Sequence, residues 1–129
     1  MHTRFAYDDG GMEFVEAPFF TLLLRGYVND DEYRRRQAAL AENPEAGDVI
    51  PGSGGFRKLR WSDSRRQKGK RGGLRVIYFS FPDENQIWFV TLYGKGKVAD
   101  LTAAEKRALK AAVEQEARRR AERRNTRRK

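Results

Sequence analysis

The sequence predicts a single α+β domain: a small, mostly antiparallel sheet with a helical pair packed on one face and a C-terminal helix. The first observation is length, since 129 residues suffice for one modest domain and not for two. The second is the order of the apolar patterns, which runs strand, helix, helix, strand, strand, strand, helix. The third is a hairpin turn between the last two strands. This order favours helices gathered on one side of an antiparallel sheet.

The N-terminal region is expected to hold a leader, one strand and one short helix. Residues 1–11 have the composition of a flexible leader, and a short strand pattern covers 12–15. Pro18 suits the first turn of a helix, because proline lacks the N–H that would go unpaired there. Gly26 is expected to end this helix.

A second helix is expected over 30–42. Asn29 and Glu32 have the spacing of a capping box, which satisfies backbone donors at a helix start. Pro44 stops the helix, because proline disfavours helical geometry in the residue before it. Residues 44–55 are rich in proline and glycine and are expected to form a loop.

Three strands are expected in the middle of the chain. Residues 56–61 alternate, so that if Leu59 and Trp61 face the core, the basic residues between them project from the other face. The segments 76–81 and 86–93 are dense in β-branched and aromatic residues. Their nearly continuous apolarity indicates central strands covered, at least in part, on both faces.

The last helix is expected to start at a second capping box, Thr102 with Glu105. Its apolar stripe runs out near Ala117, so residues 118–129 are expected to be a frayed helix or a disordered basic tail. The folded domain is therefore expected to span 12–117.

The composition excludes several kinds of chemistry. The chain has no cysteine and one histidine, His2, so disulfides, thiolate zinc sites and histidine-dependent mechanisms are not expected. We expect neither a metal nor a cofactor. The longest apolar run, residues 17–24, is too short to span a membrane, and the acidic N-terminal region does not resemble a signal peptide. A cytoplasmic location is the resulting expectation.

The net charge of +9 is concentrated in two segments. Residues 57–75 hold nine Lys or Arg against one acid, and residues 118–129 hold eight against one, so the rest of the chain is acidic. Local positive charge favours a polyanionic partner, either nucleic acid or the ribosome. The alternative for each segment is a solvated charged face.

A cationic sheet face without histidine is the only candidate site that the residues suggest. RNA supplies its own nucleophile, the 2′-hydroxyl; cleavage then needs a base, a group that stabilises the phosphorane and an acid for the leaving oxygen. Arginine clamps phosphate but cannot act as base, whereas a lysine crowded by like charges can. The residues alone are also compatible with a face that only binds phosphate.

Three motifs resemble the HigB-like branch of the RelE/ParE superfamily of type II toxins. They are NPEAGDVIPGSGGFRKLRW (43–61), KGKRGGLRVIYF (68–79) and WFVTLYGKGKVADLTAAEKRAL (88–109), and the resemblance covers about 12–117. It implies a microbial-RNase-like α+β fold, which agrees with the element order derived above. It also implies a ribosome-dependent mRNA endonuclease, a toxin that inhibits translation.

The resemblance implies site residues and partners. Arg75 would stabilise the phosphate, Lys58 would be the base, Lys95 or Tyr93 the acid, and Arg60 would form a basic pair with Lys58. Further RNA contacts are expected from nearby cations: Arg57, Arg65, Arg66, Lys68, Lys70 and Arg71. A helix-turn-helix antitoxin similar to HigA would neutralise the toxin, and the complex would bind operator DNA. The ribosome and mRNA are the other expected partners, and no interaction with a membrane is expected.

Two departures from RelE keep other functions open. Gly96 stands where RelE has an arginine, and Thr102 stands where it has a tyrosine. One alternative is a ParE-like, non-enzymatic inhibitor of DNA gyrase, because the fold alone does not distinguish the two. The other is a basic protein that binds the ribosome or RNA without cleavage. Phe56, expected on the open face, is a further candidate for stacking on a base.

Overall fold

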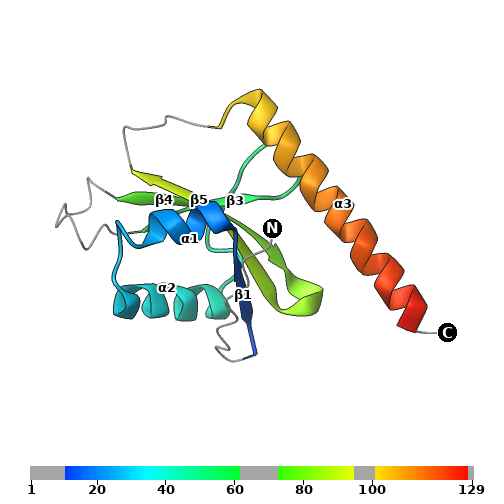
Figure 1. Cartoon of the computed structure of the whole chain (residues 1–129), viewed down its shortest axis with the longest axis horizontal. Helices are drawn as coiled ribbons and strands as arrows, with labels where there is room; N and C mark the ends of the chain where they lie inside the picture. Colours follow the sequence, from blue (N-terminus) through cyan, green and yellow to red (C-terminus); the bar gives the residue numbers. More distant parts are fainter. Residues whose placement is uncertain (1–10, 62–72, 95–100, 128–129) are drawn as a thin grey trace.

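The computed structural model of the chain describes residues 11–61, 73–94 and 101–127 (Figure 1). Within these ranges a five-stranded sheet has the order β1-β5-β4-β3-β2. The elements, in chain order, are β1 (Glu13–Glu16), α1 (Pro18–Leu24), α2 (Asp30–Glu42), β2 (Asp48–Val49), β3 (Arg57–Trp61), β4 (Leu74–Phe81), the 3₁₀ turn η2 (Pro82–Glu84), β5 (Gln86–Gly94) and α3 (Ala103–Arg127). The predicted α+β class is confirmed.

The sheet is antiparallel except at one edge. β2, β3, β4 and β5 pair in antiparallel fashion in turn, whereas β1 pairs with β5 in parallel. The expected hairpin turn between β4 and β5 is η2, which ends at Asn85 in the left-handed region (φ 47°). Both expected caps are present: the Asn29 side chain accepts from the Glu32 N–H at 2.8 Å, and Thr102 and Glu105 bond each other reciprocally.

One face of the sheet is covered by α1 and α2. Phe20 of α1 and Phe14 of β1 stack on the ring of Phe89 of β5. The rings of Tyr33 and Trp61 also contact Phe89, but at steep angles. All five rings are buried, and this larger core includes the inward residues of the three longest strands. Burial of such rings is the main stabilising contribution on this side.

A carboxylate at the end of β1 lies inside this helical layer. Glu16 is buried and accepts a hydrogen bond from the Tyr33 hydroxyl at 2.6 Å and another from Thr21 at 2.7 Å. These bonds tie β1 to both α1 and α2, because Thr21 and Tyr33 belong to the two helices. A buried carboxylate is tolerated when such donors replace its water.

The opposite face carries a second core beneath α3. Ile50, Phe56, Ile77, Phe81 and Val113 form it, with Val113 supplied by α3. Strands β4 and β5 are therefore covered on both faces, as their apolar runs predicted. Figure 1 shows α3 as one long helix that runs along one side of the molecule, away from α1 and α2.

The helix α3 extends further than its apolar stripe predicted. It runs unbroken to Arg127, so the frayed or disordered tail expected from residue 118 is wrong for 118–127. The physical reason is Arg120, which is 6 % exposed and lies over the Phe81 ring, 3.8 Å from its centroid. An arginine stacked on an aromatic ring provides the burial that the sequence pattern did not reveal.

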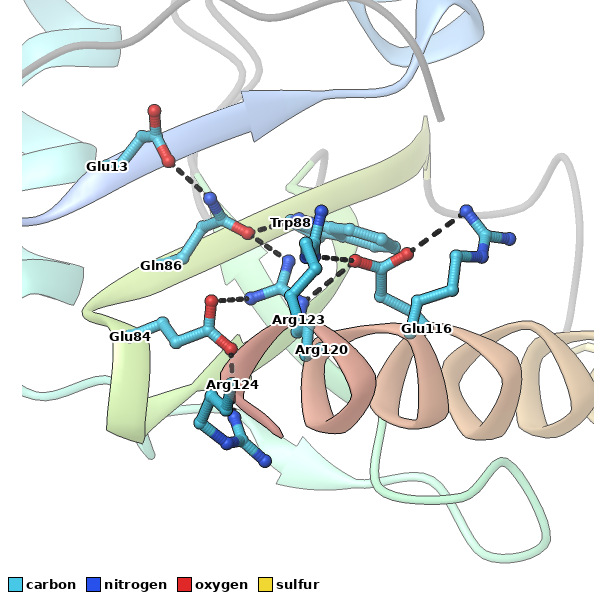
Figure 2. A network of polar contacts seen from close by, with 9 residues as sticks. Glu13, Glu84, Gln86, Trp88, Glu116, Arg120, Arg123 and Arg124 are labelled. Carbon is cyan, nitrogen blue, oxygen red and sulfur yellow. Dashed lines mark hydrogen bonds and ion pairs between the residues drawn. The ribbon is translucent and has the colours of Figure 1, made fainter. Parts of the chain in front are cut away.

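A polar network holds Arg120 in place (Figure 2). Its guanidinium contacts Glu116 Oε2 at 2.9 Å, Glu84 Oε2 at 2.9 Å and the side-chain oxygen of Gln86. The same Gln86 oxygen accepts from the Trp88 indole N–H at 2.8 Å. Figure 2 shows these groups pointing toward one another from α3 and from the β4–β5 hairpin, which fixes the helix to the sheet.

Two expectations fall on residues outside the described ranges. Apart from Gly11, the leader expected over 1–11 is outside them. Residues 62–73 have no apolar residue, which predicts a loop, and of these only Gly73 is within the described ranges. Of the helices that the structure describes, none is long and apolar enough to cross a membrane.

Candidate functional site

Three candidate residues form a row across three neighbouring strands, near one end of the sheet. Arg60 of β3 lies opposite Arg75 of β4, and Arg75 lies opposite Tyr93 of β5. Directly opposite residues in an antiparallel sheet point to the same face, with Cβ atoms about 4.5–5.5 Å apart. The row therefore brings two guanidinium groups and one phenol onto one surface.

Lys58 joins this surface one step along β3. It pairs with Ile77, which is two residues after Arg75 on β4 and thus on the same face. Leu59 and Trp61 face the other core, as the alternation of β3 predicted. The structure thus places Lys58, Arg60, Arg75 and Tyr93 on one face, the same face that α3 partly covers.

A β-bulge determines the position of Tyr93. Ile77 pairs with Thr91 and Tyr78 pairs with Phe89, so Val90 is an extra residue in β5. Strict alternation from Phe89 would send Tyr93 into the core under α1 and α2, because the side-chain period of a strand is two. The bulge shifts the alternation by one residue and turns Tyr93 toward Arg75.

A cleft of about 360 Å³ opens beside this row. Its wall comes from four parts of the chain: β2 with the following turn, β3, the central strands, and the start of α3. The lining residues are Asp48, Val49, Ile50, Pro51, Lys58, Ile77, Tyr93, Leu101 and Lys106. Lys58 and Tyr93 thus belong to both the cationic face and the cleft, so the two features form one site.

Arg75 has a buried guanidinium nitrogen on this face. Within the described part of the chain, its Nη1 atom is buried and makes no hydrogen bond. Buried donors are usually paired in folded proteins, and an anion held at this face could accept a hydrogen bond from this N–H. Arg60 directly opposite adds a second positive charge, which an anion between the two would neutralise.

The strand β2 was not predicted, and it positions one wall of the cleft. The Tyr78 hydroxyl donates to the Pro44 carbonyl at 2.8 Å and accepts from the Gly47 N–H at 2.9 Å. Burial raises the pKa of Tyr78, so the neutral phenol that makes both bonds is favoured. A Cβ on Gly47 would lie 2.9 Å from the Lys58 carbonyl oxygen, so this close approach requires glycine.

The turn after β2 lies directly beneath α3. The Ser53 hydroxyl donates to the Ile50 carbonyl at 2.7 Å and accepts from the Phe56 N–H at 3.0 Å. A Cβ on Gly54, whose φ is +82°, would come within 3.1 Å of Lys110. The turn is therefore packed against the helix, and it holds the start of α3 over the cleft.

Two expected RNA contacts are placed elsewhere. Phe56 shares the face of Lys58 but is 1 % exposed within the core under α3, so its expected role as a stacking platform is wrong. Arg57 extends from the other face of β3, and its guanidinium donates to the Gly47 carbonyl at 2.7 Å. The guanidinium of Arg57 thus stabilises the start of β2 and does not lie on the face that holds Arg60, Arg75 and Tyr93. Trp61 is a core residue, as expected.

The remaining expected residues lie outside the described ranges. They are Lys95, Arg65, Arg66, Lys68, Lys70 and Arg71. The departure at Gly96 lies outside these ranges too, whereas Thr102 caps α3. Tyr93 is thus the candidate acid that the structure positions.

Sequence reasoning missed two polar residues of the cleft. Asp48 is the cross-strand partner of Lys58, and Lys106 reaches the cleft from the first turn of α3. The only signal for Asp48 was its place in the glycine-rich loop before β3. No signal linked Lys106 to the sheet, because the docking of α3 depends on long-range packing.

No metal site is evident in residues 11–61, 73–94 and 101–127, because no three His, Cys, Asp or Glu side chains gather there. The arrangement instead suits an anion held by arginines, next to a lysine and a phenol that can exchange protons. Compared with models of known protein families, the chain matches none.

Proposed function

We propose that this protein is a ribosome-dependent endoribonuclease that cuts mRNA and thereby inhibits translation. In this proposal it is the toxin of a type II toxin–antitoxin system and belongs to the RelE/ParE superfamily. The observation that carries the proposal is the row Arg60–Arg75–Tyr93 with Lys58 beside it. The Nη1 atom of Arg75 is buried and has no hydrogen-bond partner among the described residues. This supports the proposal that a phosphate binds there.

The proposed reaction uses the substrate's own 2′-hydroxyl. Lys58 takes its proton, the 2′-oxygen attacks the adjacent phosphorus, and the bond to the 5′-oxygen breaks. Arg75 and Arg60 hold the phosphate oxygens and stabilise the added negative charge. Tyr93 gives its proton to the departing 5′-oxygen, which leaves a 2′,3′-cyclic phosphate and a 5′-hydroxyl.

Dependence on the ribosome is proposed because the site is sparse. It offers no histidine, and among the described residues no cluster that could bind a metal, so a lysine and a tyrosine are left to carry the proton transfers. A ribosome that fixes the mRNA in line for attack would supply the missing effective molarity. The proposed location is therefore the cytoplasm, where ribosomes work, and an antitoxin would keep the free toxin inactive.

Mapping of mRNA ends in a purified translation reaction tests the proposal. Wild-type protein should generate cuts in translated mRNA that are absent without ribosomes, and Arg75→Ala should lower the cutting rate at least a hundredfold. Arg34→Ala is the matched control, because Arg34 is an exposed arginine on α2, away from the row. Circular dichroism should be used to check that both variants are folded.

Two other outcomes would replace the proposal. Inhibition of DNA supercoiling by purified gyrase, with mRNA left intact, would support the ParE-like alternative. Stalled translation with intact mRNA would support a binding protein that does not cleave. Full cutting by the Arg75→Ala variant would refute the assigned site.

A further inference from the structure

The cleft beside the cationic row has features that phosphate binding does not explain. Part of its lining is apolar and comes from Ile50, Ile77 and Leu101. Val49 also lines the cleft and is 52 % exposed, although exposed large aliphatic side chains are few in the described chain. A phosphate site gains nothing from such a surface, whereas the flat face of a nucleobase does.

The size of the cleft suits one nucleotide. About 360 Å³ is near the lower end of the volumes of small-molecule sites, roughly 300–1,000 Å³. Because Lys58 and Tyr93 line the cleft and also stand beside Arg75, a base in the cleft would be attached to the phosphate held by the row. The cleft and the row would thus contact neighbouring parts of one substrate.

Two polar groups in the cleft have opposite hydrogen-bonding character. The Asp48 carboxylate only accepts hydrogen bonds, and the Lys106 ammonium only donates them. They come from different elements, Asp48 from β2 and Lys106 from α3. Guanine matches this pair, because it has two adjacent donors, N1–H and N2–H, and two adjacent acceptors, O6 and N7.

We infer that the cleft binds a guanine base next to the scissile phosphate, with Asp48 and Lys106 as the residues that determine specificity. The Asp48 carboxylate accepts from guanine N1–H and N2–H, and Lys106 donates to O6 or N7. Adenine, cytosine and uracil each offer only one donor group to a carboxylate, so they lose half of this contact. The inference rests on the proposed function for its substrate, RNA, and adds the base that is preferred.

Cleavage-site preference is the first test. On mRNAs that differ only in the nucleotide flanking the cut, wild-type protein should cut at guanine about tenfold more often than at adenine. Asp48→Asn should reduce this ratio to below about threefold, and so should Lys106→Met. The matched controls are Asp83→Asn in the exposed η2 turn and Lys110→Met one turn further along α3; both should keep the wild-type ratio.

Binding without the ribosome is the second test. Guanosine 3′-monophosphate should shift the NMR methyl signals of Val49, Ile77 and Leu101 in wild-type protein and not in Asp48→Asn, whereas adenosine 3′-monophosphate should bind about tenfold more weakly. Cutting without base preference, or an equal response to both nucleotides, would overturn the inference and leave the proposed endonuclease intact. Selective guanine binding by a protein that never cuts would uphold the cleft and refute the endonuclease.

Discussion

Arg60 and Arg75 lie directly opposite each other across the β3–β4 pair, on the same face of the sheet. Like charges in this position repel and destabilise the strand pair. The fold therefore keeps an unfavourable contact at the centre of the candidate site. An anion bound between the two guanidinium groups would turn this repulsion into attraction.

Replacing Arg60 with threonine should increase stability and reduce activity. The Arg60→Thr change removes the repulsion, so the free energy of unfolding should rise by about 0.5 kcal/mol in urea titrations at low salt. Cutting of mRNA should fall at least tenfold, because one of the two phosphate clamps is lost. The gain in stability should vanish near 1 M salt, where charge interactions are screened; a loss of stability at low salt would contradict the repulsion.

Removing only the hydroxyl of Tyr93 tests its role as the acid. Tyr93→Phe should lower the rate of mRNA cutting by about a hundredfold, because the leaving 5′-oxygen loses its proton donor. The free energy of unfolding should change little, since the ring remains and Tyr93 is only partly buried. An unchanged cutting rate would remove Tyr93 from the mechanism and leave the acid among residues outside the described ranges.

The Tyr78 hydroxyl should stabilise β2 in a pH-dependent way. Tyr78→Phe should cost about 2 kcal/mol, because the buried Gly47 N–H loses its acceptor. Burial raises the pKa of Tyr78 above 10.0, so its phenol ionises more readily in the unfolded chain than in the folded protein. Stability from this group is therefore complete below pH 10 and declines as the pH rises further.

Urea denaturation of wild-type protein and Tyr78→Phe between pH 8 and pH 11 provides the check. The wild-type advantage should shrink above pH 10, and the difference between the two proteins isolates Tyr78 from the other tyrosines. A constant difference over this range would show that ionisation of Tyr78 is not linked to folding.

Arg120 should be the residue on which the far half of α3 depends. Arg120→Met keeps the length of the side chain but removes the closest charge partner of the buried Glu116, which then keeps only the longer contacts of Arg119 and Arg123. The loss should cost about 2 kcal/mol of stability. Arg118→Met on the exposed side of α3 should change stability by less than about 0.5 kcal/mol. Hydrogen exchange should show faster opening of 116–127 in the first variant only.

Most of the fold could be predicted, because it follows from local patterns. The alternation of β3 correctly separated Lys58 and Arg60 from Leu59 and Trp61, and the capping residues marked the starts of α2 and α3. These features depend on neighbours within a few residues. They do not require knowledge of which segments meet in space.

The features that could not be predicted depend on long-range contacts. The two-residue strand β2 exists because the Tyr78 side chain, about thirty residues later, binds the Pro44–Gly47 segment. The end of α3 is helical because Arg120 stacks on Phe81. A hydropathy pattern assigns arginine to the exposed side of a helix, so it does not predict this contact. Phe56 was expected on an open face because the sequence of the strand does not show that α3 packs over it.

The extra residue in β5 links two properties that are usually adjusted separately. Because Val90 sets the alternation of everything after it, Leu92 enters the hydrophobic layer only if Tyr93 enters the cleft. If β5 kept Val90 but lost the bulge, strict alternation would put the Tyr93 phenol among packed apolar groups and Leu92 between cations. The bulge in this one strand thus couples the burial of Leu92 to the position of Tyr93 on the opposite face.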